Sequence, residues 1–168
     1  IRVIGQQLKD RVQYSMLALH NKKFNDMTQK GYNMNKLKAY LHNSAILQLV
    51  KKIKNKPLVI VDQFAEEKLY FNYLKDEGEI YRDITFTTKA ESKYASVAVA
   101  SIIARYAFLQ YFDNLSDKSG YDLLKGAGKK VDLQVAQIIE EKGEKFLYSI
   151  SKTNFRTLDK AKEILSGK

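Results

Sequence analysis

A short apolar run that ends in a carboxylate is the feature that most constrains the fold of this chain. Residues 58–61 (LVIV) follow Pro57 and lead directly into Asp62. A run this short and this uniformly apolar is typical of a strand buried on both faces, as in parallel sheets covered by helices. Residues 84–88 (ITFTT) are predicted to form another strand. Because helical segments alternate with these strands, the sequence predicts an α/β fold.

Apolar spacing and capping residues predict the other elements. A partial helix over 1–8 has no capping residue ahead of it, which suggests a truncated chain or missing upstream residues. With no repeat and no linker, we expect a single domain over 1–168. The remaining predicted elements are a strand over 12–19, a helix over 21–29, a long helix from Asn33 or Asn35 to about Ile53, and helices over 66–74, 92–112, 131–141, 144–150 and 157–165.

The segment 92–112 carries the longest apolar signal in the sequence. It is apolar almost all round and contains five alanines, at positions 95, 98, 100, 104 and 107. This composition predicts a buried central helix whose alanines allow close backbone approach. We expect no apolar run to reach the length of a membrane span, and no signal peptide opens the chain.

Charge and cysteine content narrow the function classes. The 168 residues include 29 Lys and Arg against 19 Asp and Glu, a formal net charge of +10. This excess favours a polyanionic partner such as nucleic acid, although a basic protein without such a partner has the same composition. The chain has no cysteine, which excludes disulfides, thiolate metal sites and cysteine nucleophiles and suits a cytoplasmic location.

Two carboxylates are the candidate catalytic and metal-binding residues. Asp62 ends a predicted buried strand, at the sheet edge where open α/β folds place their ligands, although a surface aspartate that begins a turn has the same position. Glu91 follows the strand 84–88 and opens the long helix, where a carboxylate is also an ordinary capping feature. Since both follow strand ends, the two side chains are expected to converge and to suit Mg²⁺ or Mn²⁺.

Polar residues around Glu91 are candidates for substrate binding. Lys89, Lys93, Ser92 and the neighbouring threonines could form a phosphate cradle, although a solvated basic loop is the usual fate of such a cluster. Tyr94 could contact a sugar or lie at the edge of the core. His20 and His42 lack a metal-ligand spacing. A basic C-terminal region could follow a duplex or simply face solvent; it comprises Lys125, Lys129, Lys130, Lys152, Arg156 and Lys160.

Several motifs, in order, resemble the type 2 ribonucleases H. Residues 89–94 (KAESKY) followed by 97–105 (VAVASIIAR) resemble the signature in which a catalytic carboxylate leads into a small-residue helix. Residues 59–64 (VIVDQF) resemble the strand that carries another catalytic carboxylate, and residues 35–43 resemble the helix before it. The tail motifs at 125–127, 131–132 and 154–157, and Glu at position 91, are similar to the HIII branch.

This resemblance implies a ribonuclease H-like fold and endonucleolytic cleavage of the RNA strand of RNA/DNA hybrids with two metal ions. Asp62 and Glu91 would be catalytic metal ligands, and Lys89, Ser92 and Tyr94 would contact the substrate. The family also carries an Asp-Glu pair on its first strand, and we find no equivalent here. We therefore expect the C-terminal part of a catalytic domain, with an incomplete mixed sheet flanked by helices and its first strands missing.

A chain with two of four carboxylates is expected to be weakly active or inactive alone. Its uncovered sheet edges would favour self-association. The alternative interpretations are a non-catalytic, basic nucleic-acid-binding module and an α/β domain that serves protein association.

Overall fold

The computed structural model describes residues 1–153 and 156–167. The chain divides into two compact units, which are described in turn. Unit 1 comprises residues 1–18 and 32–110, and unit 2 comprises residues 19–31 and 111–168. The single domain expected over 1–168 stays a prediction. Asn154 and Phe155, part of the tail motif, lie outside the described residues.

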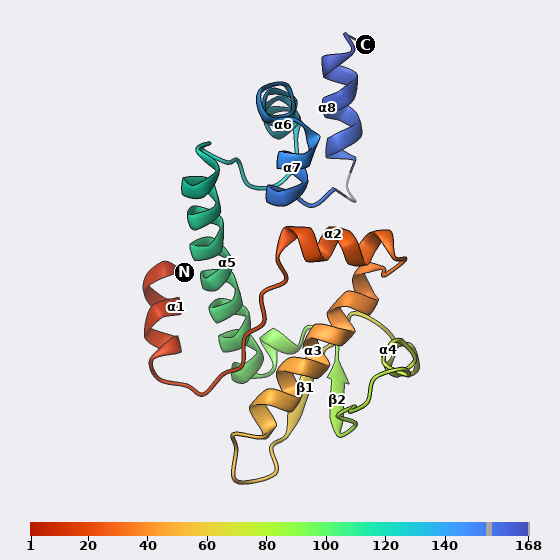
Figure 1. Cartoon of the computed structure of the whole chain (residues 1–168). Helices are drawn as coiled ribbons and strands as arrows, with labels where there is room; N and C mark the ends of the chain where they lie inside the picture. The colour runs from red at the N-terminus through yellow and green to blue at the C-terminus, as the bar shows by residue number, and fades with distance from the viewer. Residues whose placement is uncertain (154–155, 168) are drawn as a thin grey trace. The chain divides into compact units, whose positions relative to one another are not determined.

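Unit 1 holds both strands of the described chain and the helices that follow and precede them (Figure 1). Its long helix, α5, continues into unit 2. The elements, in order, are α1 (Arg2–Lys9), α3 (Met34–Val50), β1 (Val59–Asp62), α4 (Glu67–Tyr73), β2 (Ile84–Thr87), the 3₁₀ turn η1 (Ala90–Ser92) and α5 (Ala95–Ser119).

The strands β1 and β2 pair in parallel, in a register that runs from Val59 beside Ile84 to Asp62 beside Thr87. The strand predicted at the apolar run is present as β1, and helices precede and follow it in the chain. This confirms the α/β class. A mixed sheet was expected, but the two described strands are parallel to each other.

The core of unit 1 lies between α3, α4 and β2. It is built on Ala39, Tyr70 and Leu74, which are fully buried, with Phe86 of β2 packed against them. The Tyr70 and Phe86 rings meet edge to face at 5.0 Å, the geometry that aromatic quadrupoles prefer. Burying side chains of this size contributes about 2 kcal/mol each. This packing fixes β2, and with it the sheet edge where Asp62 lies.

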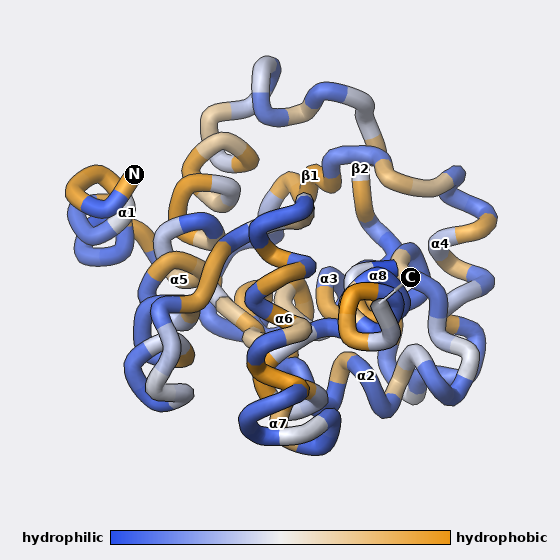
Figure 2. Tube along the Cα trace, turned by 90° about the horizontal axis from the view of Figure 1, so that it is seen from above, coloured by the Kyte–Doolittle hydropathy of each residue, from blue (hydrophilic) through white to orange (hydrophobic). Residues whose placement is uncertain are grey.

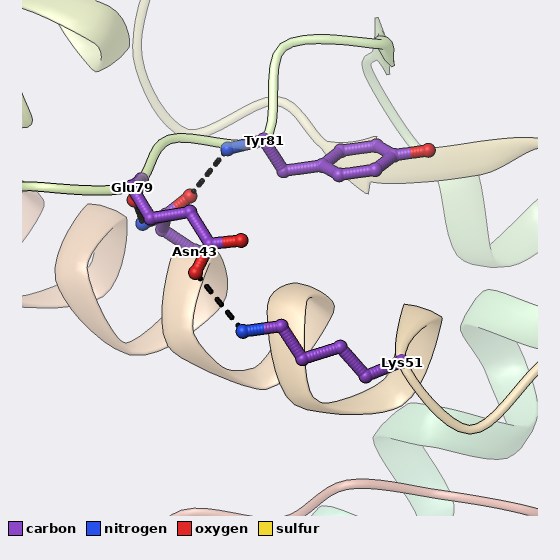
Figure 3. Close-up of polar contacts among 4 residues, drawn as sticks. All are labelled: Asn43, Lys51, Glu79 and Tyr81. Atoms are coloured by element: carbon purple, nitrogen blue, oxygen red, sulfur yellow. Dashed lines mark hydrogen bonds and ion pairs between the residues drawn. The ribbon is translucent and has the colours of Figure 1, made fainter.

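A buried amide fixes the segment that enters β2 (Figure 3). The Asn43 side chain is 2% exposed; its Nδ2 donates to the Glu79 carbonyl at 2.9 Å, and its Oδ1 accepts from the Tyr81 N–H at 3.0 Å. An exposed ion pair between Lys51 and Glu79 lies beside it. The α3 helix itself begins as predicted, because the Asn33 side chain accepts the Lys36 N–H at 2.8 Å.

The prediction of a strand over 12–19 is wrong. Residues 12–19 lie in no helix or strand. A strand needs a neighbour for its hydrogen bonds, and the two strands in the described part of the chain pair with each other. The β-forming composition of this segment therefore produces an irregular connection.

The long helix differs from the prediction in both position and burial. It begins at Ala95 rather than Ser92, and only Ile103 and Tyr106 of this helix are buried. The trace of α5 carries many hydrophobic residues (Figure 2). The prediction that this helix is buried is wrong, because few described residues pack against it.

The length and composition of α5 also correct the expectation about membrane spans. Its 25 residues include a window of mean hydropathy 1.3, which is enough to cross a membrane by length and composition alone. One such helix is weak evidence of a membrane, since core helices of globular proteins share this composition.

The α1 helix contacts α5 through a glycine. Gly5 is buried, and a Cβ at this position would overlap the Tyr106 Cβ and lie 2.6 Å from its Cγ. The Tyr106 hydroxyl also donates to the Gln6 side chain at 2.6 Å. The close backbone approach expected of the alanines in α5 is thus provided at this point by Gly5 in α1.

Unit 2 is helical and includes the end of α5. The helices α6, α7 and α8 pack around Val135, Ile138, Leu147 and Ala161. The other elements match the predicted ranges closely: α2 (Asn21–Gln29), α6 (Lys129–Lys142), α7 (Glu144–Ile150) and α8 (Thr157–Leu165).

A fully buried asparagine joins α2 to the end of α7. The Asn25 amide donates to the carbonyls of Tyr148 and Ser151, and its oxygen accepts the Thr153 N–H at 2.9 Å. These bonds satisfy the polar atoms of a side chain that would be costly to bury unpaired. They also fix the chain just past α7.

Candidate functional site

Asp62 is the last residue of β1 and lies opposite Thr87, the last residue of β2. Its side chain is exposed, and its Oδ1 accepts the backbone N–H of Ala90 at 2.9 Å. Its other carboxylate oxygen accepts no hydrogen bond from the described residues. The carboxyl ends of the two parallel strands therefore form one edge, with Asp62 on it, as the sequence predicts.

Glu91 lies in η1, the residue after the one that Asp62 contacts. It was expected to open the long helix, but the 3₁₀ turn separates it from α5. The backbone N–H of Ala90 points at Asp62, and Ala90 itself is fully buried. The structure thus brings the Glu91 segment to the Asp62 carboxylate, with the Glu91 side chain exposed to solvent.

The turn between β2 and η1 has an unusual backbone. Lys89 has φ 54° and ψ 40°, in the left-handed region, and is the only non-glycine residue with positive φ in the described chain. Its carbonyl accepts the Ser92 hydroxyl at 2.8 Å. Both side chains are exposed. Lys89 is therefore free to extend into solvent, whereas the Ser92 hydroxyl is engaged within the turn.

The Lys93 ammonium is hydrogen-bonded within the turn. Its Nζ donates to the Thr87 hydroxyl at 3.1 Å and to the Thr88 carbonyl at 2.9 Å. The sequence places these threonines beside the lysine but cannot show that they bind it. Tyr94, the last predicted substrate residue, is half-buried and donates its N–H to the Ala90 carbonyl at 2.8 Å.

The donor set fits a hard divalent cation in kind but not in number. Asp62 and Glu91 supply carboxylate oxygens, the ligands that Mg²⁺ and Mn²⁺ prefer. Across residues 1–153 and 156–167, no group of three or more aspartate, glutamate or histidine side chains could hold a metal ion. Asp62 and Glu91 are thus the two candidate ligands that the described residues bring to this edge of the sheet.

Neither histidine belongs to a group of metal-ligating side chains in the part of the chain that the structure describes. The His20 ring contacts Tyr111, with Nδ1 3.1 Å from the hydroxyl oxygen. His42 lies edge-on to Phe64, with ring centroids 5.1 Å apart. Burial lowers the pKa of His42, and the positive charge of Lys38 lowers it further. Both histidines therefore contact aromatic side chains.

The basic C-terminal region lies in unit 2, and some of its cations have partners. The Lys125 ammonium is over the Phe112 ring, and Lys160 lies 3.8 Å from the nearly buried Asp132. Lys129 and Lys130 are exposed and make no side-chain bond with another described residue. They occupy the first turn of α6, where a positive charge opposes the helix dipole.

The sequence and the fold match one family of nucleases. A family model described as Ribonuclease HII matches residues 1–158, so the chain belongs to the ribonuclease HII family.

Its relatives within that family carry the name ribonuclease HIII. The ribonuclease HIII of Lysinibacillus sphaericus is 43% identical over 98% of this chain and 54% of the relative. The ribonuclease HIII of Bacillus cereus is 45% identical over the same shares. The crystal structure of Bst-RNase HIII in complex with Mn²⁺ superimposes with a TM-score of 0.94 at 37% identity, covering 99% of this chain and 55% of that one.

These comparisons confirm the resemblance to ribonuclease HIII and the ribonuclease H-like fold. The chain spans about half the length of the curated relatives that it matches.

Proposed function

We propose that the full-length gene product is a metal-dependent endonuclease that cleaves the RNA strand of RNA/DNA hybrids. The observation that carries the proposal is the 2.9 Å bond from the Ala90 N–H to Asp62 Oδ1, which joins the end of β1 to the turn that carries Glu91. The likeness to an Mn²⁺ complex of ribonuclease HIII supports the choice of Mg²⁺ or Mn²⁺ as the ion.

Asp62 and Glu91 would hold the metal with further ligands from outside this chain. A bound divalent pair would supply an activated water and stabilise the leaving 3′-oxygen. The bond from Ala90 orients the Asp62 carboxylate and leaves its other oxygen available as a ligand. Because each carboxylate lies at an exposed edge, a duplex can approach them without any opening of the core.

Substrate contacts are proposed for Lys89, Ser92 and Tyr94. Lys89 is the strongest of the three, because its exposed ammonium is free to meet a backbone phosphate. The Ser92 hydroxyl would have to exchange its bond to the Lys89 carbonyl for one to the substrate. Tyr94 is half-buried, which favours a role at the base of the site.

The test uses the full-length gene product with Asp62→Asn or Glu91→Gln, assayed on an RNA/DNA hybrid in Mn²⁺. Both variants are expected to lose activity by about 100-fold or more, because each removes a charge that a metal ligand needs. Circular dichroism and hybrid binding should stay near wild type. Near-normal cleavage by both variants would contradict the assignment.

A non-catalytic nucleic-acid-binding module is the second candidate for the chain on its own. It is favoured by the two-ligand donor set in the described residues and by the net charge of +10. It predicts salt-sensitive hybrid binding by the 168-residue chain with no cleavage stimulated by metal. A cytoplasmic location without a membrane partner, and self-association through strand edges, are proposed with either function.

A further inference from the structure

The turn that carries Glu91 is closed by the ammonium of Lys93. From the end of β2, the turn passes through Thr88 and Lys89 and enters η1, and Lys93 follows directly after η1. From that position its Nζ reaches back to the Thr87 hydroxyl and the Thr88 carbonyl. The side chain therefore bridges the two ends of the segment that presents Glu91.

The backbone of this turn needs such support. A non-glycine residue in the left-handed region, as Lys89 is here, costs roughly 1–2 kcal/mol. Conformations of this kind persist only when surrounding bonds hold them. Besides backbone bonds such as that from the Ser92 N–H to the Lys89 carbonyl, the turn has side-chain bonds from Lys93, from the Ser92 hydroxyl to the Lys89 carbonyl, and from the Ala90 N–H to Asp62. Lys93 supplies the only charged donor among them.

The geometry favours support over contact with the substrate. An ammonium has three protons, and two of those on Lys93 are directed at oxygens within the turn. Turning the side chain toward a phosphate would break both bonds and release the turn. Lys89, four residues earlier, is exposed and has no such commitment.

We propose that Lys93 is a positioning residue for Glu91. It holds the β2–η1 turn in the conformation in which the Glu91 carboxylate serves the same site as Asp62. This proposal rests on the proposed function, because it assigns the purpose of the turn to metal binding. Residues that orient metal ligands in this way typically change metal affinity or activity by about 10- to 100-fold when they are replaced.

The test compares Lys93→Met and Lys93→Arg in the full-length gene product. Lys93→Met keeps the length of the side chain and removes the charged donor, so Mn²⁺ affinity by calorimetry without hybrid should fall by about 10- to 100-fold. The kcat on a hybrid should fall by a similar factor, while KM should stay within about threefold. Lys93→Arg keeps the charge and the donors and should restore most of the Mn²⁺ affinity and of the kcat.

A second variant separates support of the turn from phosphate contact. Thr87→Val removes one acceptor of the Lys93 ammonium without changing any charge, and it should lower Mn²⁺ affinity and kcat in the same direction but by less. A lysine that contacts phosphate would be indifferent to this change. The matched control is Lys75→Met, which should behave as wild type. Lys75 is an exposed lysine in unit 1 with no side-chain bond to a described residue.

The outcomes separate the two roles of Lys93. Unchanged Mn²⁺ affinity and kcat in Lys93→Met would overturn the inference, as would a rise in KM alone with a shallower salt dependence, since that pattern belongs to a phosphate contact. If wild type cleaves the hybrid and Asp62→Asn does not, either result contradicts the role of Lys93 only. A wild-type protein that does not cleave hybrids contradicts the proposed function itself.

Discussion

Asp62, a proposed metal ligand, also fixes the backbone of a neighbouring turn. One of its oxygens accepts the Ala90 N–H. Asp62→Ala would therefore remove a charge and also release the turn. Asparagine keeps an oxygen that can accept this bond. Reduced activity in Asp62→Asn therefore reports the missing charge, and a larger reduction in Asp62→Ala would report the turn in addition.

The lowered pKa of His42 predicts a pH dependence of stability. The folded state disfavours the charged ring, so the unfolded state, with a pKa near 6.5, binds the proton more readily. The stability contribution is present above pH 6.5 and is lost as the pH falls toward the lowered folded value. Urea unfolding between about pH 7.5 and 5.5 should show this decrease, and His42→Gln should flatten the curve. An unchanged slope in that variant would contradict the prediction.

The sequence identifies the two carboxylates but not how they are joined. Asp62 and Glu91 stand out because each follows a predicted strand. The bond through Ala90, the left-handed Lys89 and the commitment of Lys93 to the turn depend on partners 5 to 28 residues away in sequence. A pattern of residue types cannot specify which donor meets which acceptor, and for this reason the sequence alone groups Lys93 with the phosphate-binding candidates.

At the scale of elements, the contact between α1 and α5 depends on the absence of a side chain at Gly5. In an isolated helix, alanine would be favoured over glycine by about 1 kcal/mol. Here a Cβ would overlap Tyr106, so Gly5→Ala should destabilise the chain by about 1–3 kcal/mol. Thermal and urea unfolding of the chain would measure this change.

Gly78 provides the matched control for that substitution. A Cβ added at Gly78 would meet nothing within 4 Å. Gly78→Ala should therefore leave the free energy of unfolding within about 0.5 kcal/mol of wild type or raise it slightly. A Gly5→Ala variant that is no less stable than wild type would show that contact with Tyr106 does not govern this position.

The sequence predicts the ranges of the helices and strands more accurately than it predicts which elements pack against them. The helices at 21–29 and 157–165 and both strands lie close to their predicted ranges, because local signals such as the apolar run of β1 mark them. The predictions for the segment 12–19 and for the burial of α5 are wrong because both depend on which elements lie alongside. Hydrophobicity indicates that a surface can be buried, while the neighbours decide whether it is.

At the scale of the whole molecule, two lysines stand out among the cations that give the chain its net charge of +10. Lys129 and Lys130 are placed where the α6 dipole disfavours them, which suggests a function for their charge. If they bind a duplex, replacing both by glutamine should make the slope of log affinity against log salt shallower by about 0.9 for each phosphate no longer neutralised. Titrations of the chain with a labelled hybrid between low and moderate salt would measure this slope.

The control replaces Lys52 and Lys54, two exposed lysines of unit 1, by glutamine. This pair removes the same charge from the chain and is expected to change the slope by less. Equal changes in the two double variants would show that the duplex responds to net charge rather than to the α6 terminus.

The bond between Asp62 and Ala90 also bears on the order of folding. Its partners are 28 residues apart, on either side of α4: Asp62 ends β1, and Ala90 lies in the turn that follows β2. Local segments fold early, while contacts of long sequence separation must await loop closure. Pairing of the strands and assembly of the candidate site should therefore occur in one step, so that an intermediate without the sheet has neither half of the site in place.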